Sequence, residues 1–360
     1  MIQWFMKTFP NYVLMMRECS YHYKNLTFNQ HHLEGDVWSH TVMAYNLGIK
    51  NSVSEEVLWA LLLHDIGRVF TRNEIEKKRH VSFGDFEGVS CFVALEILNK
   101  SKLTNNQKVN ILKIISYQYT IIDFIKYDDP TEDEIIETFL YEKELLNNLA
   151  HYVECDLFAR VIGSSKTHLY NIEKIKKFQE SLKLFDNRKK ASSLKKNTLY
   201  ILVGPPCSRK SSWIKNIESD FIVISRDRYT QEIGKKYEKY SYDESYELMK
   251  NNKDVKKEVL ALEEECEEYA KNSKGRDIII DNPNLKLSHR KEWIDALSSS
   301  HKIKVILFLT PFKSLLTCSE NRSKSIKKSL DEEGYIYKLK TFSYPLLNEG
   351  IDEIEHIFND

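Results

Sequence analysis

The chain has 360 residues, which is more than one hydrophobic core usually holds, so two domains of ordinary size are expected. Apolar residues make up 42% of the chain, a share that suits a folded protein. Lys plus Arg and Asp plus Glu each total 53, which gives a formal net charge of zero. The sequence therefore excludes a protein that binds nucleic acid through a global basic field, and any contact with nucleic acid must be local.

The six cysteines are scattered, without a CxxC pair or the dense spacing of a disulfide framework, and this indicates a reducing compartment. The apolar stretches near the start are interrupted by charged and polar residues, and no later apolar run is long enough to span a bilayer. The expected location is therefore the cytoplasm, with no membrane partner. The composition sets no oligomeric state.

Two kinds of sequence pattern divide the chain. Residues from about 36 to 182 carry apolar side chains at helical spacing, so an all-α domain is predicted over residues 1–185. The segment 186–197, DNRKKASSLKKN, is short and charged, and it is the expected linker. Over residues 198–360, the β-branched runs TLYILV, FIVIS, DIIID and KVILFLT alternate with charged helical stretches. This alternation predicts an α/β domain with a parallel sheet.

The stretch from Val57 to Leu63 is apolar almost all round, as expected of a buried helix, and it leads directly into His64, Asp65 and then Gly67. Burying an unpaired carboxylate is strongly unfavourable, so Asp65 needs a partner, and a divalent cation bound jointly with His64 would provide one. The alternative is a hydrogen-bonded structural pair without a metal.

Two further segments add the same residue types. DVWSHT places His40 on a helix that is expected to begin near Asp36, and LAHYVECDLFAR places Asp156 on a later helix. With His64 and Asp65 they form a mixed imidazole and carboxylate set that suits Mn²⁺, Fe²⁺, Ni²⁺, Co²⁺ or Zn²⁺. Such a site lowers the pKa of a bound water and polarises a phosphoryl oxygen, which is the chemistry of phosphate-ester hydrolysis.

The ordered segments DVWSHT, LLLHDIGR and CDLFAR resemble the signatures of the HD phosphohydrolase superfamily over most of residues 36–160. The resemblance implies an HD-domain helical bundle in which His40, His64, Asp65 and Asp156 bind the metal, with Asp65 also counted as catalytic. It covers most of the first domain.

Some positions depart from that family's pattern. Where many members have two further histidines, this chain has Phe86 or Asp85 in one segment and Gln118 in the other, which favours one metal over two. His80 and Arg68 are candidate contacts for the substrate phosphate. The alternatives are that His80 is an exposed loop residue and that Arg68 caps a helix.

TLYILV followed by GPPCSRKSSWIKN has the strand, loop and helix context of a phosphate-binding loop. Backbone N–H groups and the helix dipole would hold the phosphates, with Lys210 reaching the β and γ phosphates and Ser211 binding Mg²⁺. ATP or another NTP is therefore the expected cofactor, together with Mg²⁺. The predicted nucleotide-binding residues in this loop are Gly204, Arg209, Lys210, Ser211 and Ser212.

Arg209 stands where the pattern G-x-x-x-x-G-K-S has its second Gly, and Cys207 stands where many kinases have a further Gly. A Gly lets the backbone come close to the phosphates, so Arg209 must either point away or add its own charge to the nucleotide site. The alternative is a turn with no nucleotide-binding role.

The segments after the phosphate-binding loop place polar residues past the ends of strands, where substrates bind in such sheets. FIVISRDRYTQEIG places Asp227 there, DIIIDNPNLKLSHRKEW places Asp281 and Asn284, and FLTPFKSLLTCSENRSKSIKK adds a basic segment. Together, over about residues 198–330, they resemble the bacteriophage-type 5′-OH polynucleotide kinases. The resemblance implies Asp227 as general base and Asp281 at the nucleotide site.

The same resemblance implies that Arg322 or Lys324, in the basic segment, stabilises the transferring phosphoryl group. The family's acceptor-phosphate Arg corresponds to Thr230 here, so Arg226 or Arg228 is the candidate for that contact, and Asn284 is a further candidate for substrate binding. The alternative for the SRDRY segment is a helix N-terminus in which Ser225 or Asp227 acts only as a cap.

The order of the two modules resembles that of the bifunctional HD-Pnk RNA end-healing enzymes. That resemblance implies removal of a 2′,3′-cyclic phosphate or 3′-phosphate and phosphorylation of a 5′-hydroxyl on broken RNA, with tRNA as a candidate, before a separate RNA ligase joins the ends. One alternative is a nucleotidase joined to a nucleoside or nucleotide kinase. The other is an active phosphohydrolase whose P-loop domain only binds nucleotide or RNA.

Overall fold

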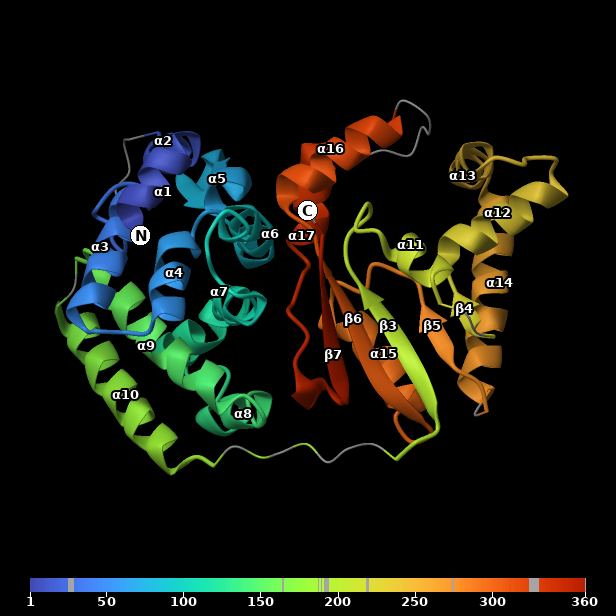
Figure 1. The fold of residues 1–360 in the computed structure, drawn as a ribbon. Coiled ribbons are helices and arrows are strands. Elements are labelled where there is room, and N and C mark those ends of the chain that lie inside the picture. Colours follow the sequence, from blue (N-terminus) through green and yellow to red (C-terminus); the bar gives the residue numbers. More distant parts are fainter. Residues whose placement is uncertain are drawn as a thin grey trace. The chain divides into compact units, whose positions relative to one another are not determined.

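The computed structural model describes residues 1–24, 29–163, 165–186, 188, 190, 194–217, 220–273, 275–323 and 330–359. The chain divides into two compact units (Figure 1). The first comprises Met1–Lys189 and Leu339–Tyr344, and the second comprises Lys190–Lys338 and Pro345–Asp360. None of the helices in the described part combines the length and low polarity needed to cross a membrane.

The first unit is mainly helical. Its helices are α1 (Ile2–Thr8), α2 (Pro10–Glu18), α3 (Val37–Lys50), α4 (Glu55–Leu63), α5 (Arg68–Thr71), α6 (Phe86–Leu98), α7 (Asn105–Tyr127), α8 (Glu132–Thr138), α9 (Lys143–Ala159) and α10 (Ser165–Leu184). Helix α3 packs against α4 and α9, and α4 and α9 both pack against α7. Asp36 caps α3 by accepting a hydrogen bond from the backbone N–H of Ser39 (2.9 Å), as expected of a carboxylate at a helix N-terminus.

The prediction that this unit is helical is confirmed, but it is not purely α. A short antiparallel hairpin joins β1 (Asn73–Ile75) to β2 (His80–Ser82) through a 3₁₀ turn, η1 (Glu76–Lys78). Three-residue strands are too short for alternation to show above the helical pattern around them, so they were not predicted from the sequence. His80 pairs with Ile75 in this hairpin and is exposed, so it lies on a strand rather than in the expected loop.

The second unit is built around one parallel sheet, as predicted. Its strands are β3 (Asn197–Val203), β4 (Ile222–Ile224), β5 (Ile278–Ile280), β6 (His301–Leu309) and β7 (Glu353–Phe358). The four strands expected from the sequence are all present, and β7 is an addition at the edge beside β6. The order is β4-β5-β3-β6-β7, and every neighbouring pair is parallel.

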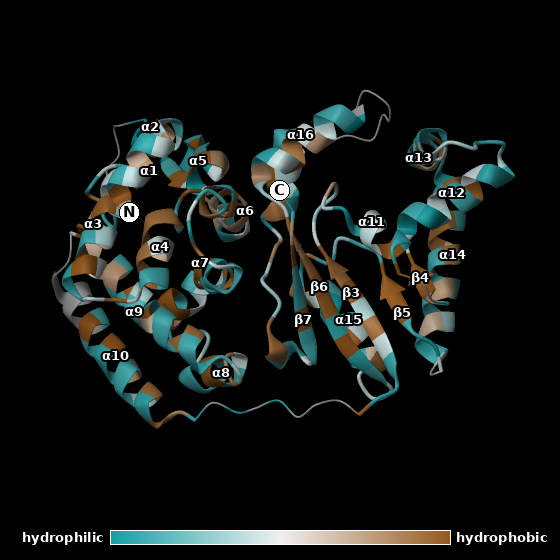
Figure 2. Cartoon of the chain, viewed as in Figure 1, coloured by the Kyte–Doolittle hydropathy of each residue, from teal (hydrophilic) through white to brown (hydrophobic). Residues whose placement is uncertain are grey.

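The helices of the second unit are α11 (Lys210–Lys215), α12 (Arg226–Lys236), α13 (Tyr242–Asn251), α14 (Lys253–Asn272), α15 (Leu287–Leu297), α16 (Phe312–Ser323) and α17 (Glu332–Leu339), with a 3₁₀ turn at η2 (Leu347–Glu349). Strands β5 and β6 are largely hydrophobic (Figure 2), and Ile279, Ile306 and Phe308 are buried there in the core. Helices α11, α12 and α16 begin beyond the carboxyl ends of β3, β4 and β6, at the upper edge of the sheet in Figure 1. A ligand site is expected at that edge.

Candidate functional sites

Four buried titratable side chains converge in the helical unit. His40 lies on α3, His64 and Asp65 follow α4, and Asp156 lies on α9, and each is 1% exposed or less. His40 Nε2 lies 2.8 Å from Asp156 Oδ1, while His64 Nε2 lies 3.3 Å from Asp65 Oδ2 and 3.4 Å from Asp156 Oδ1. The structure therefore brings together the four residues that the sequence singled out as ligands.

The spacing of these atoms fits one divalent cation. His40, His64 and Asp65 offer ligand atoms that lie within 4.8 Å of one another, and Asp156 contacts both histidines. A transition metal sits about 2.0–2.2 Å from nitrogen and oxygen ligands, which places neighbouring ligand atoms roughly 3 Å apart. His64 Nε2 is buried and makes no aligned hydrogen bond. A cation would use that atom, so the donor set fits a mixed-ligand metal site.

Each carboxylate of this cluster also faces an arginine. Arg68 Nε lies 2.7 Å from Asp65 Oδ1, and Arg160 donates to Asp156 Oδ2. Burial alone would raise the pKa of both carboxyl groups, but these arginines and the neighbouring histidines hold both values well below the usual range. Both groups are therefore ionised, with one oxygen turned towards an arginine and the other towards the histidines.

The backbone around His64 is fixed by side chains from other helices. His64 Nδ1 lies 2.9 Å from Leu61 O, which leaves Nε2 for the cluster. Ser90 Oγ donates to His64 O (2.7 Å) and accepts from the Gly67 N–H (2.9 Å). A Cβ on Gly67 would lie 2.5 Å from Phe86 O, so only glycine permits this close approach between the turn and α6.

The positions that depart from the HD pattern serve other purposes. Gln118 donates from Nε2 to His64 O (3.3 Å) and to Ile115 O (3.1 Å), and its Oε1 accepts from Tyr152 (2.7 Å), so it supports the cluster from outside. Asp85 precedes α6 and is exposed, and Phe86 is buried beneath the guanidinium of Arg68, 4.0 Å from the ring centroid. Neither offers a ligand atom to the cluster.

Arg68 is a buried residue with protein partners on both sides. It begins α5, and its Nη2 donates to Tyr119 Oη (2.9 Å) while its Nε faces Asp65. Two more cationic side chains near the cluster were not predicted from the sequence. Arg160 is 7% exposed, and burial, reinforced by the charge of Arg160, lowers the pKa of Lys126 to about 8. Three cations are thus associated with the cluster.

Three further residues near the cluster were also missed. Tyr21 Oη donates to Asp65 Oδ2 (2.9 Å), and the Tyr21 ring stacks on His32 with centroids 4.0 Å apart. Glu34 Oε1 lies 2.7 Å from His32 Nδ1 and 3.1 Å from His40 Nδ1. The pair of nearby histidines in QHHLEG was the available sequence signal, but its side-chain directions depend on tertiary packing.

In the α/β unit, the phosphate-binding loop follows β3, the central strand. Lys210 begins α11, and its Nζ donates to Gly204 O (2.7 Å) and Pro205 O (3.0 Å). A Cβ on Gly204 would lie 2.6 Å from Ser208 Oγ, so the loop closes tightly on this glycine. Burial lowers the pKa of Lys210 to about 8, and the charges of Asp281 and Asp227 oppose that effect.

Both residues that replace glycines in this loop have left-handed backbones. Cys207 and Arg209 each have φ of 65°. L-residues other than Gly, Asn and Asp rarely adopt this conformation, because Cβ approaches the following carbonyl. Ser211 and Ser212 are exposed in the first turn of α11, and the Ser212 N–H donates to Arg209 O (3.1 Å). The loop therefore keeps the backbone conformation that glycines would favour, although other residues occupy these two positions.

Asp281 lies between the phosphate-binding loop and Asp227, because β5 lies between β3 and β4 in the sheet. Ser225 Oγ lies 3.5 Å from Asp281 Oδ2, and Asp227 is in the first turn of α12. Burial raises the pKa of Asp281, while the charge of Lys210 lowers it and that of Asp227 raises it further. The three charged groups therefore share one electrostatic site at the carboxyl edge of the sheet.

Asp227 and its two arginine neighbours are exposed at the start of α12. Tyr242 Oη donates to Asp227 Oδ1 (3.1 Å), which orients the carboxylate. Arg226 is held by Glu263 through Nε (2.8 Å) and Nη2 (2.7 Å), whereas the charge of Arg228 acts on Asp281. Ser225 occupies the N-cap position without a side-chain capping hydrogen bond.

Asn284 is buried beneath the sheet edge. Its Nδ2 donates to Leu202 O (2.8 Å), Ile280 O (3.3 Å) and Asn282 O (3.0 Å), so the amide ties the ends of β3 and β5 together. Its φ of 46° lies in the left-handed region, which Asn tolerates. Of the two predicted lid residues, Arg322 lies in the last turn of α16, where its charge acts on Tyr242, and Lys324 lies outside the described residues.

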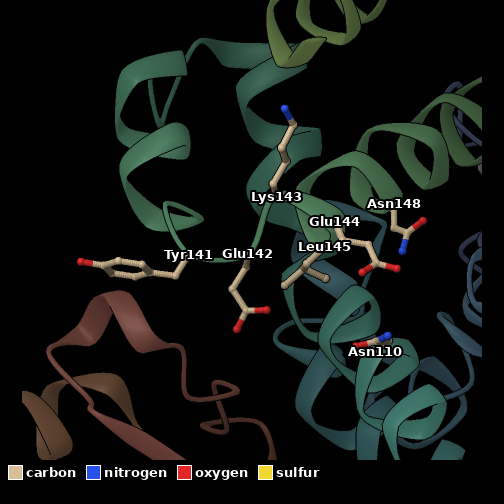
Figure 3. Close-up of a pocket in the computed structure, with 7 residues that line it drawn as sticks. All are labelled: Asn110, Tyr141, Glu142, Lys143, Glu144, Leu145 and Asn148. Atoms are coloured by element: carbon tan, nitrogen blue, oxygen red, sulfur yellow. The ribbon is translucent and has the colours of Figure 1, made fainter. Parts of the chain in front are cut away.

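A separate pocket lies on the helical unit (Figure 3), at the turn before α9 and against α7. Its lining residues are Asn110, Tyr141, Glu142, Lys143, Glu144, Leu145 and Asn148. Lys113 Nζ lies 2.6 Å from Glu142 Oε1, which neutralises one carboxylate at its edge. None of the cluster residues lines this pocket.

Residues 199–333 match the family model of an AAA domain, a P-loop kinase-like family. No curated protein matches the chain. The match covers the phosphate-binding loop, Asp227, Asp281 and α16, and it agrees with the parallel sheet. The second unit therefore contains a P-loop kinase-like domain, which supports the use of a nucleotide with Mg²⁺ and a kinase-type activity.

Proposed function

We propose that this chain heals broken RNA ends, with an HD-type metal-dependent phosphohydrolase in the first unit and a 5′-hydroxyl polynucleotide kinase in the second. The first activity would remove a 2′,3′-cyclic phosphate or 3′-phosphate, and the second would phosphorylate a 5′-hydroxyl. The healed RNA, with tRNA as a candidate, would then serve a separate RNA ligase.

The observation that carries the kinase assignment is the shared site of Lys210, Asp281 and Asp227. Each of these charges shifts the pKa of another across the carboxyl edge of the sheet. A domain that only binds nucleotide needs the lysine, but it has no need for an oriented carboxylate beside it. Asp227, oriented by the hydrogen bond from Tyr242, would act as the base for an incoming hydroxyl.

In the kinase step, the 5′-hydroxyl oxygen attacks the γ-phosphorus of ATP while its proton passes to Asp227. The bond from the γ-phosphorus to the bridging oxygen breaks, and ADP leaves. Lys210 would stabilise the negative charge on the phosphates, and Ser211 and Asp281 would hold Mg²⁺. Arg322 at the end of α16 provides a further cation for the transferring phosphoryl group.

In the phosphohydrolase step, His40, His64, Asp65 and Asp156 would hold a divalent metal, which would supply a water of lowered pKa and polarise the phosphoryl oxygen. The protein contributes the cations around this cluster. Arg68 and Arg160 hold the ligand carboxylates ionised, and Lys126 adds a positive charge for the substrate phosphate. A substrate with a terminal phosphate fits this set of charges.

The deciding experiment uses one RNA oligonucleotide with a 5′-hydroxyl and a 2′,3′-cyclic phosphate, and follows both ends. Wild type with labelled ATP and Mg²⁺ should label the 5′ end, and Lys210→Ala and Asp227→Ala should abolish labelling but keep hydrolysis at the other end. Asp65→Ala should abolish hydrolysis at the 3′ end but keep labelling of the 5′ end. Lys215→Ala, an exposed lysine on the same short helix as Lys210, is the matched control and should retain both activities.

Two outcomes would replace this proposal. Equal transfer to free nucleosides and to the oligonucleotide would favour a nucleotidase joined to a nucleoside kinase. Hydrolysis of the 3′ end with no transfer to any hydroxyl would favour a phosphohydrolase that carries a nucleotide-binding or RNA-binding domain.

A further inference from the structure

Glu34 lies on the far side of His40 from the ligand carboxylates. His40 uses its two ring nitrogens in opposite directions, since Nε2 lies 2.8 Å from Asp156 Oδ1 and Nδ1 lies 3.1 Å from Glu34 Oε1. The imidazole of a metal-binding histidine commonly presents its second nitrogen to a carboxylate in this way. His64, in contrast, presents its second nitrogen to a backbone carbonyl, Leu61 O.

Glu34 is itself held by several donors. His32 Nδ1 lies 2.7 Å from its Oε1, and the Val161 N–H donates to its Oε2 (3.1 Å). The side chain is only 2% exposed. Glu34 is therefore a buried carboxylate with a fixed orientation.

The local backbone explains how Glu34 reaches this place. Gly35 has φ of 95°, a conformation that favours glycine, and its N–H donates to His32 O (3.3 Å). This turn leads directly into Asp36, the cap of α3, so the residues before the cap fold back beneath His40. The Leu33 N–H donates to Val161 O (2.9 Å), which fastens the turn to the end of α9.

We propose that Glu34, supported by His32, is a positioning residue that fixes the ring orientation of His40 and increases the electron density at the nitrogen facing the metal. This inference rests on the metal site of the proposed function. In this arrangement, Nδ1 of His40 faces Glu34 Oε1 at 3.1 Å, and Nε2 would be the nitrogen that binds the cation. Through the imidazole ring, the carboxylate would make Nε2 a stronger electron donor to the metal.

A second metal bound by His32, Glu34 and His40 is the competing interpretation, because these three residues also offer atoms within 4.8 Å of one another. The contacts of Glu34 argue against it. Two ring nitrogens and one backbone N–H already surround its carboxylate, so the group is compensated without a cation. Both His40 Nδ1 and His64 Nε2 make no aligned hydrogen bond, so it is the compensation of the Glu34 carboxylate by its neighbours that separates the two clusters.

The test measures metal binding to the full chain after chelation, with Mn²⁺ for calorimetry and Co²⁺ for its visible absorption spectrum. Wild type should bind one equivalent, and Asp156→Asn should lose it. Glu34→Gln, which keeps the shape but not the charge, should still bind one equivalent, with an affinity about 10–100-fold lower and a shifted Co²⁺ spectrum. Glu142→Gln, which alters a carboxylate paired with Lys113 elsewhere in the unit, should match wild type.

The possible failures are distinguishable. If Glu34→Gln had the metal affinity and Co²⁺ spectrum of wild type while Asp156→Asn bound no metal, the positioning role would be overturned. The metal site itself would still be supported. Two equivalents in wild type and one in both Glu34→Gln and His32→Ala would show a second metal instead. No bound equivalent in wild type would overturn the proposed phosphohydrolase together with this inference. Thermal unfolding of the variants after the metal has been removed with a chelator distinguishes a folding defect from a local change at His40.

Discussion

Arg209 adopts a left-handed backbone conformation, with φ of 65°, directly before Lys210. The lysine begins α11, and its ammonium group is held by the carbonyls of Gly204 and Pro205. The position ahead of Lys210 thus has the backbone shape that a glycine would adopt without strain, but it carries a long charged side chain. Backbone shape and side-chain charge at this position can be separated by mutation.

Arg209→Gly and Arg209→Ala should have different effects. Both remove the guanidinium, but only Gly removes the left-handed strain, so Arg209→Gly should be more stable to unfolding than Arg209→Ala by about 1 kcal/mol. Urea denaturation of the two variants measures this difference. If Arg209 also contacts the nucleotide, both variants should bind ATP more weakly than wild type by a similar factor. Equal free energies of unfolding for Arg209→Gly and Arg209→Ala would show that the backbone at this position is not strained.

The buried pair of Arg160 and Asp156 should be sensitive to loss of one partner. Arg160→Met leaves Asp156 without its arginine in a site that is nearly closed to solvent, and this should lower the free energy of unfolding by about 3 kcal/mol. Arg160→Lys, which keeps the charge, should lower the free energy of unfolding by less than Arg160→Met. Chemical denaturation of the chelated proteins tests this, and a change below about 0.5 kcal/mol in Arg160→Met would show that the pair is not needed for stability.

Asn284 should behave as a structural residue. Asn284→Gly removes the amide that donates to three carbonyls and creates no backbone strain at φ of 46°. We expect a loss of about 1–3 kcal/mol in stability, because buried carbonyls are left without a donor. Asn284→Ala should lose more, since alanine disfavours this φ. A stable Asn284→Gly protein with a raised KM for the phosphate acceptor would instead indicate direct substrate contact.

Glu87 should make the stability of the helical unit depend on pH. Burial raises its pKa to about 7 from an ordinary value of 4.5, against the opposing charge of Arg68. The folded state therefore binds more protons than the unfolded state in that interval, so the contribution of Glu87 is fully present at low pH and is lost as the pH rises from about 4.5 to about 7.

Glu87→Gln cannot titrate, so its stability should fall less than that of wild type over this interval. The measurement is urea denaturation of both proteins at about pH 5 and about pH 8, which lie below and above most of the transition. Glu137→Gln, at an exposed position on α8, is the control and should retain the wild-type dependence. Parallel curves for Glu87→Gln and wild type would refute the raised pKa.

Much of this architecture could be read from the sequence. The helical first part follows from apolar residues at helical spacing, and α4 buries most of its length as that pattern requires. The four predicted strands are β-branched runs, and the polar residues after them meet at one edge, because parallel strands end on the same side. The edge strand β7, EIEHIF, and the two short strands of the hairpin were missed. Their patterns are too short or too mixed with charged residues to stand out.

The residue types at the two sites were also visible in the sequence, because HDIG and GPPCSRKSS are local motifs with chemical requirements of their own. The partners of those residues were not. Tyr21 and Glu34 reach the cluster from the segment between α2 and α3, and Arg160 reaches it from the C-cap of α9. No spacing in the chain relates Tyr21 to Asp65. Only the packing of α3, α4 and α9 sets those distances, because side-chain contacts between elements depend on how their buried faces fit together. The sequence thus determined which chemical groups the chain possesses, and the tertiary structure decided which of them share a site and which, like Asn284, hold the backbone in place.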